Sequence, residues 1–279
     1  MGKWKNLKGI DLDVLRDNRR SLHQAVQLVG VVPRNLLPHD PTDGTASLEW
    51  NANLNSLEAI PVTNPVGLEV SIGLCIKSFS LYLSSTGTEV DSFDMKGKST
   101  NEGLYWLKEK LEKLLFPIED ITLDLPYKIE NYNSLRPLGA SAKATKEYAR
   151  LYANMNKVLY DLVRERKDAY DVRCWPHHFD LATLIPIKLD QAGEITESIG
   201  VGLSPGDDGI NEPYIYVNVW PEIDVERLKK HKLPVGQWNS DGWSGAVLTY
   251  SQLLNEPDQK TSFVAFIDFA IQAIDTELK

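Results

Sequence analysis

The chain has 279 residues, of which 42% are hydrophobic and 25% charged, a composition that allows a buried core and gives no sign of disorder. Its net charge is −9, and an acidic surface repels phosphate backbones, so we expect no nucleic-acid partner. The two cysteines lack the spacing of a zinc site, and we expect no metal. The longest apolar stretch, residues 263–274, contains Asp268 and Gln272, and no signal-peptide core is present. We therefore expect a cytoplasmic protein without a membrane partner.

Apolar spacing predicts four helices. The first covers residues 11–32 and is expected to stop at Pro33. The second begins at the capping box Ser99-Thr100-Asn101-Glu102, in which serine and glutamate side chains bind backbone amides reciprocally. The last two cover residues 142–166 and 263–278. The mixed charges of residues 16–20 in the first helix predict a solvated face and not the lining of a groove.

Strand-like runs separate the helices, and their short Gly/Asp/Pro-rich connections favour antiparallel pairing. The predicted strands lie within residues 46–62, 68–75 and 77–84 and within residues 172–187, 198–203, 214–220 and 244–250. The fold class is α+β, with two diverged helix–strand–strand–helix repeats whose antiparallel sheets are packed by helices. We expect an N-terminal repeat at 1–116, a bridge with three prolines at 117–138 and a C-terminal repeat at 139–279, folded as one compact unit.

The repeat interpretation depends on one spacing. Trp50 and Trp175 are 125 residues apart, and so are Pro61 and Pro186, which indicates an internal duplication. The alternative is that two α+β halves converge on similar patterns. The same spacing places the neutral Asn53 and Asn55 opposite residues 178 and 180, which confines acid–base capacity to the second copy.

The segment 174–182 carries the main candidate site. As a strand, it would place His178 and Asp180 on one face, with His177 on the other. A histidine beside a carboxylate suits a general base or a hydrogen-bonding group in a pocket. The alternative is a buried His/Asp pair with a structural role. His177 is a lesser ligand-binding candidate, because neighbours on a strand point in opposite directions.

Four further residues are candidates for ligand binding. Asp207 and Glu212 lie in the loop 204–213, which also fits a plain turn. Trp238 and Trp243 flank another turn, where they could form the walls of a pocket or pack the turn on the core.

Several strings carry a resemblance to a known family. The strings Pro176-His177-His178-Phe179, Asp180-Leu181-Ala182, Pro205-Gly206 and Glu212-Pro213-Tyr214 resemble a bacterial family of unknown function with P-x-H-F, F-D-L-A, G-x-x-P-G and E-P-x-F-Y strings. The similarity is strongest from residue 174 to the final helix. In this chain the H-F and F-D-L-A strings are fused. The resemblance implies a related fold and no particular reaction.

The functional hypothesis is a small-molecule-binding protein, or a hydrolase-like enzyme, with a polar pocket around His178 and Asp180 in the C-terminal half. The alternative is a non-catalytic scaffold or protein-interaction module. The sequence does not define a substrate, a cofactor or an oligomeric state.

Overall fold

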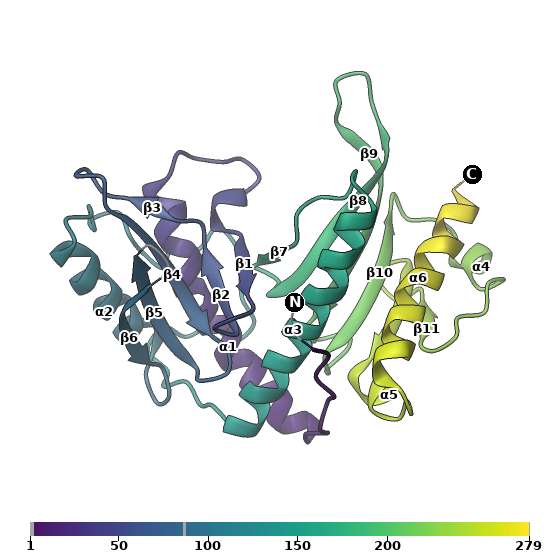
Figure 1. Cartoon of the computed structure of the whole chain (residues 1–279), viewed down its shortest axis with the longest axis horizontal. Coiled ribbons are helices and arrows are strands. Elements are labelled where there is room, and N and C mark those ends of the chain that lie inside the picture. Colours follow the sequence, from purple (N-terminus) through teal and green to yellow (C-terminus); the bar gives the residue numbers. More distant parts are fainter. Residues whose placement is uncertain (1–2, 86–87, 279) are drawn as a thin grey trace. The chain divides into compact units, whose positions relative to one another are not determined.

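The computed structural model describes residues 3–85 and 88–278, and the chain divides into two compact bodies. The N-terminal body comprises residues 10–149 and 173–179, and the C-terminal body comprises the residues up to Gly9, residues 150–172 and the chain from Asp180 onward. Each body is α+β, with helices packed on an antiparallel sheet (Figure 1). The bodies do not coincide with the expected repeats, since the bridge segment lies within the N-terminal body.

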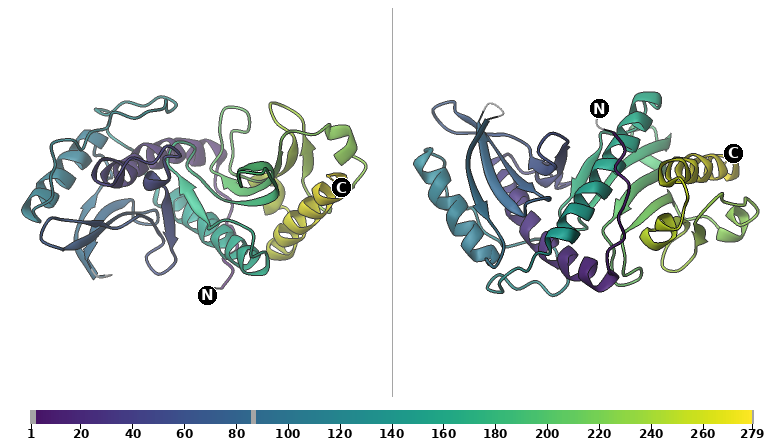
Figure 2. Two further views of the ribbon diagram at one scale, coloured as in Figure 1. Left: turned by 90° about the horizontal axis from the view of Figure 1, so that it is seen from above. Right: turned by 60° about the horizontal axis from the view of Figure 1, so that its bottom comes forward.

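The sheet of the N-terminal body is antiparallel throughout. Its strands, in spatial order, are β7 (Arg173–Trp175), β1 (Leu48–Asn51), β2 (Ser56–Ala59), β4 (Glu69–Cys75), β5 (Ser80–Ser85) and β6 (Thr88–Asp94), with the short β3 (Val62–Thr63) also paired to β4. The helices α1 (Leu12–Leu36) and α2 (Thr100–Lys113) lie on one face of this sheet (Figure 2), and a 3-10 turn (Gly44–Ala46) precedes β1.

The helices of this body follow local signals in the sequence. The Asp11 side chain caps α1 by accepting from the amides of Asp13 and Val14, and the predicted capping box of α2 is confirmed. The prediction that Pro33 ends the first helix is wrong, because α1 continues to Leu36. A proline in the last turn removes one N–H, and the Pro33 carbonyl still accepts from Leu37 at 2.9 Å.

The C-terminal body also pairs its strands antiparallel throughout. Its strands, in spatial order, are β8 (Asp180–Leu189), β9 (Ile195–Ser204), β10 (Tyr214–Trp220), β12 (Gly245–Thr249) and β11 (Gln237–Asn239). Its helices are α4 (Val225–Leu228), α5 (Tyr250–Leu254), α6 (Gln259–Glu277) and the part of α3 (Ala142–Glu165) from residue 150 onward. Both α6 and this part of α3 lie on the same face of the sheet (Figures 1 and 2). No helix among the described residues is long and apolar enough to cross a membrane.

Two of the predicted strands are interrupted by four-residue turns. The turns cover residues 52–55 and 176–179, and each ends in a left-handed residue, Asn55 with φ 53° and Phe179 with φ 57°. The turns are 176 − 52 = 124 residues apart, one fewer than the spacing of the tryptophans. Aligned by these turns, position 178 corresponds to Leu54 and position 180 to Ser56, so the expected correspondence with two asparagines is not seen.

The same cross-strand contact occurs once in each body. In the N-terminal body the Tyr82 ring covers Gly73, its partner on β4. In the C-terminal body the Tyr216 ring covers Gly202, its partner on β9. A Cβ atom at either glycine would overlap the tyrosine ring, so each position requires glycine for close packing.

Candidate functional site

The turn 176–179 changes the geometry expected for the two adjacent histidines. Because these residues form a turn, the strand prediction is wrong at this point and the alternation of side chains does not apply. The rings of His177 and His178 lie 4.3 Å apart, centroid to centroid, and the His177 ring lies 5.4 Å from that of Tyr127. The functional roles of both histidines stay predictions.

Two side chains of α1 hold this turn. His23 Nε2 lies 2.9 Å from the Pro176 carbonyl oxygen, and Gln27 Nε2 donates to the same oxygen at 2.7 Å. The His23 ring stacks on Phe179. Burial lowers the pKa of His23 to about 4 and also lowers the pKa of His177, so both rings are kept neutral near pH 7. No group of histidine, cysteine or carboxylate side chains within the described ranges has a metal-binding arrangement.

In the C-terminal body, two predicted aspartates bind tyrosines. Asp180 accepts from the Tyr216 hydroxyl at 2.6 Å, and the Tyr216 ring meets Trp243 edge-on at 6.3 Å. Asp207 accepts from two backbone amides of its own loop and from the Tyr214 hydroxyl. Burial, followed by the bond to Asp207, raises the pKa of Tyr214. Asp207 therefore organises the loop.

The other two predicted residues of this body also make structural contacts. Glu212 accepts from the backbone amide of Ser251 in the first turn of α5 at 2.7 Å, and Trp238 Nε1 donates to the His231 carbonyl at 2.7 Å. These bonds fit the structural alternative for both residues. His178 and Asp180 belong to different bodies, and their predicted partnership remains a hypothesis.

The predicted solvated face of α1 is partly buried instead. Asn18 and Arg19 are each only 3% exposed, because the predicted bridge segment lies along α1. Glu130 of that segment pairs with Arg19 at 3.3 Å and with Arg20 at 2.5 Å. The prediction failed because the residues that cover this face follow more than a hundred positions later, so no local pattern shows them.

Further polar bonds fix residues 127–141, called the covering segment below, to α1. The Tyr127 hydroxyl donates to Gln27 at 2.8 Å, and the Ser141 amide donates to the Asn18 side-chain oxygen at 3.0 Å. The sequence contains one signal for this arrangement, since Asn18, Ser21, Gln24 and Gln27 recur at three-residue spacing. Uncharged polar side chains in such a row indicate a helix face with polar partners.

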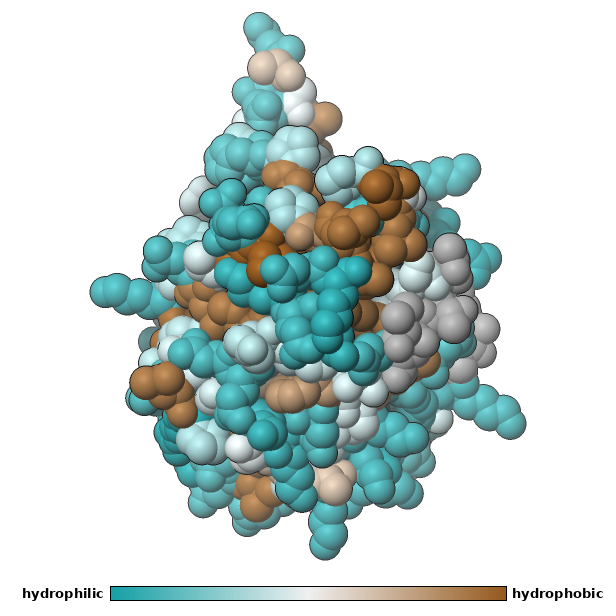
Figure 3. All heavy atoms as spheres, turned by 90° about the vertical axis from the view of Figure 1, so that its left-hand side faces the viewer, coloured by the Kyte–Doolittle hydropathy of each residue, from teal (hydrophilic) through white to brown (hydrophobic). Residues whose placement is uncertain are grey.

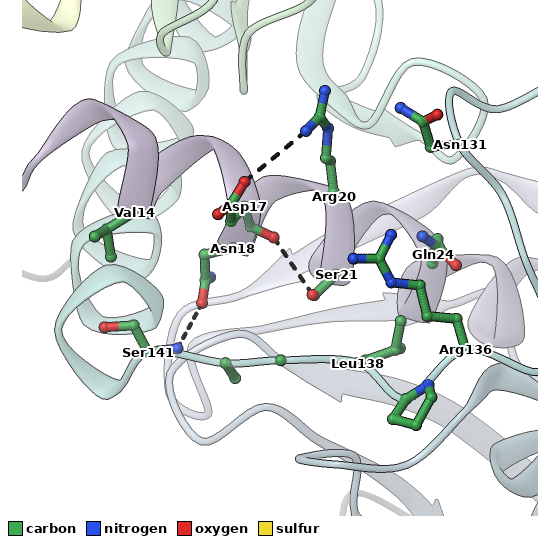
Figure 4. A pocket seen from close by; sticks show the side chains of 13 residues that line it. Val14, Asp17, Asn18, Arg20, Ser21, Gln24, Asn131, Arg136, Leu138 and Ser141 are labelled. Atoms are coloured by element: carbon green, nitrogen blue, oxygen red, sulfur yellow. Dashed lines mark hydrogen bonds and ion pairs between the residues drawn. The ribbon is translucent and has the colours of Figure 1, made fainter.

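A hollow of about 520 Å³ lies between α1 and residues 131–141 (Figure 4). The polar side chains that line it are Asp17, Asn18, Arg20, Ser21, Gln24, Asn131, Arg136 and Ser141. Figure 4 shows Arg136 extending from the covering segment toward the α1 side chains. The volume is within the range of pockets that bind small molecules.

Two buried nitrogen atoms of the lining residues lack hydrogen-bond partners in the described part of the chain: Asn18 Nδ2 and Arg20 Nε. The Asn18 amide orientation is fixed, because its oxygen accepts from Ser141. Arg136 makes no ion pair with any residue that the structure describes. Buried donors without partners are uncommon and costly in folded proteins. This hollow is therefore the candidate site.

A second hollow, of about 470 Å³, lies beside α2 and is lined by the rings of Phe93, Tyr105 and Trp106. Its charged groups are already paired, for example Lys98 with Glu102 at 3.0 Å. On the side of the molecule that carries α2, apolar residues form several groups separated by hydrophilic ones (Figure 3). None of the buried unpaired polar atoms of the described residues belongs to its lining, and we consider it the weaker candidate.

The fold and the first hollow together define an α+β protein with a polar, solvent-facing cavity in its N-terminal body. In comparisons with known proteins, the chain matches no family model, no curated protein and no solved structure.

Proposed function

We propose that the protein binds a small polar molecule in the hollow between α1 and residues 131–141. The observation that carries the proposal is the pair of buried donors, Asn18 Nδ2 and Arg20 Nε, which have no partner among the described residues. Both atoms are covered from solvent, so a ligand in the hollow would bond to them after the lining side chains turn toward it, which would remove the free-energy cost of leaving them unpaired. The proposal keeps the small-molecule function expected from the sequence and moves its site to the N-terminal body.

The lining groups favour binding over chemistry. Asp17 contacts Arg16 at 3.3 Å and Arg20 at 3.8 Å, so this carboxylate is already engaged in ion pairs. No histidine or cysteine lines the hollow. We therefore propose a binding protein and assign no catalytic residue.

Filling the hollow tests this proposal. Gly139 lines the hollow, and a Cβ atom there would meet nothing within 4 Å, so Gly139→Phe should fold and occupy the space. Ligand-detected NMR with a mixture of carboxylic acids, sugar phosphates and polyols would identify binders of the native chain. We expect Gly139→Phe to weaken their binding by roughly tenfold or more.

Ala192→Phe is the matched control, since it adds the same ring at an exposed position of the C-terminal body. It should leave binding unchanged. Binders that keep their affinity in Gly139→Phe would place the ligand elsewhere and contradict the proposal.

We also propose that the two bodies derive from a duplicated unit. The support for this is the tyrosine-over-glycine contact, which occurs in both bodies. In both bodies the tyrosine hydroxyl donates to a carboxylate on the next strand but one, Glu58 on β2 or Asp180 on β8. The proposal predicts that equivalent substitutions in the two bodies have similar effects.

A further inference from the structure

We infer that the ligand of this hollow is a small anion, bound through its carboxylate or phosphate oxygens. The inference rests on the proposed function, because it names the chemical class of the ligand at the same site. It depends on three features of the hollow: the kind of atom that lacks a partner, the local balance of charge, and the geometry of Arg136.

The unpaired atoms are all donors. Asn18 Nδ2 and Arg20 Nε are N–H groups, whereas the Asn18 oxygen is already used by the Ser141 amide. A ligand that satisfies the site must therefore present acceptors. Carboxylate and phosphate oxygens are acceptors that carry charge, and hydrogen bonds to them are about twice as strong as bonds between neutral groups.

The charge around the hollow is opposite to that of the chain. The chain carries a net charge of −9. The charged residues that line the hollow are Arg20, Arg136 and Asp17, and their ion-pair partners outside the lining are Arg16 and Glu130. The excess of one positive charge makes this a local cationic site on an acidic protein, which favours an anion over a neutral or cationic molecule.

Arg136 supplies the remaining charge in a suitable form. Its guanidinium makes no ion pair with a described residue and extends toward α1 (Figure 4). A guanidinium presents a planar set of donors that matches a carboxylate or a phosphate with two parallel bonds. Asn131 also lines this side of the hollow. The anion would thus bind Arg136 directly, and it would reach the covered donors of Asn18 and Arg20 once these side chains turn toward it.

Isothermal titration with succinate, inorganic phosphate and the neutral polyol erythritol tests the inference. We expect succinate or phosphate to bind and erythritol not to bind, and the preferred anion decides between a carboxylate and a phosphate ligand. Arg136→Gln should weaken anion binding by roughly tenfold or more, because it removes a charge-assisted pair of bonds. Lys128→Gln is the control: Lys128 is exposed in the same segment and does not line the hollow, so binding should be unchanged.

Asn18→Asp is the second variant. It keeps an oxygen for the Ser141 amide and replaces the free N–H₂ with a negative oxygen, so we expect it to abolish anion binding while circular dichroism stays native. Anion binding that is equal in native, Arg136→Gln and Asn18→Asp proteins would overturn the inference. Binding of erythritol that Gly139→Phe abolishes, without anion binding, would also overturn it but would leave the proposed function standing. Absence of binding by all three probes and by the screening mixture would remove both.

Discussion

At the scale of single residues, the burial of the His23 ring could not be predicted from the sequence. His23 lies on a helix that the sequence predicts, yet its burial depends on the turn 176–179, which the sequence does not predict. That turn ends in Phe179 in a left-handed conformation, where glycine or asparagine is usual. With a bulky aromatic at this position, the alternating pattern of residues 174–182 indicates an uninterrupted strand. The prediction of an uninterrupted strand through residues 174–182 was wrong for this reason.

The low pKa of His23 makes stability depend on pH. Its pKa is about 4 in the folded protein and 6.5 in the unfolded chain, so below pH 6.5 the unfolded state binds a proton that the folded state does not. The stabilisation is fully present above pH 6.5 and is lost as the pH falls toward 4, by about 3 kcal/mol in total. The lowered pKa of His177 acts in the same direction.

Urea denaturation at several pH values between 4 and 7 measures this dependence. We expect the free energy of unfolding of the native chain to fall with decreasing pH and that of His23→Gln to fall less steeply. The exposed His39 provides the control variant His39→Gln, which should keep the native slope. A slope that is unchanged in His23→Gln would show that the buried ring is not the group that titrates.

At the scale of helices and strands, elements with local signals were predicted and those without were missed. The capping box of α2 and the apolar stripes of α3 and α6 lie within the elements themselves, so the sequence defines these helices to within a few residues. The strands β3 and β11 are two and three residues long, which is too short for an alternating pattern. The strand β6 was missed because residues 88–94 contain few apolar side chains. The alternating pattern of a half-buried strand is therefore weak there.

The tyrosine-over-glycine contact gives a prediction at this scale. Gly73→Ala and Gly202→Ala place a methyl group inside the ring of Tyr82 or Tyr216, so each should lower the free energy of unfolding by about 1–3 kcal/mol. Gly139→Ala is the control, because a methyl group there enters open space and should change stability little. Denaturation monitored by circular dichroism checks all three. A cost in only one of the two bodies would argue against the proposed duplication.

At the scale of the whole molecule, the order of the chain does not match the order of the bodies. The sequence predicts two halves joined by a bridge at 117–138. In the structure this segment covers α1 and forms one side of the candidate hollow. Composition identified the segment as unusual, since three prolines prevent regular structure. Its role could not be predicted, because it depends on contacts between residues more than a hundred positions apart.

The first residues of the chain belong to the C-terminal body and give the last prediction. Trp4 packs edge-on against Phe263 of α6, and the Leu7 amide donates to Gln259 at 2.8 Å. The Asn154 side chain of α3 bonds to both the amide and the carbonyl of Lys5, at 2.9 and 2.7 Å. Removing residues 1–9 therefore exposes apolar surface and leaves polar groups unpaired in the C-terminal body, although the deletion lies at the opposite end of the sequence.

Hydrogen exchange followed by mass spectrometry resolves this effect by segment. We expect the truncated chain to exchange faster in α6 and in the part of α3 beyond residue 150, with β4 and β5 of the N-terminal body unchanged. Trp4→Ala is the finer variant, because it removes the ring contact with Phe263 and keeps the backbone bonds of Lys5 and Leu7. It should accelerate exchange in α6 more than in α3. Faster exchange in β4 and β5 with α6 unaffected would show that the first nine residues stabilise the other body, as the order of the sequence suggests.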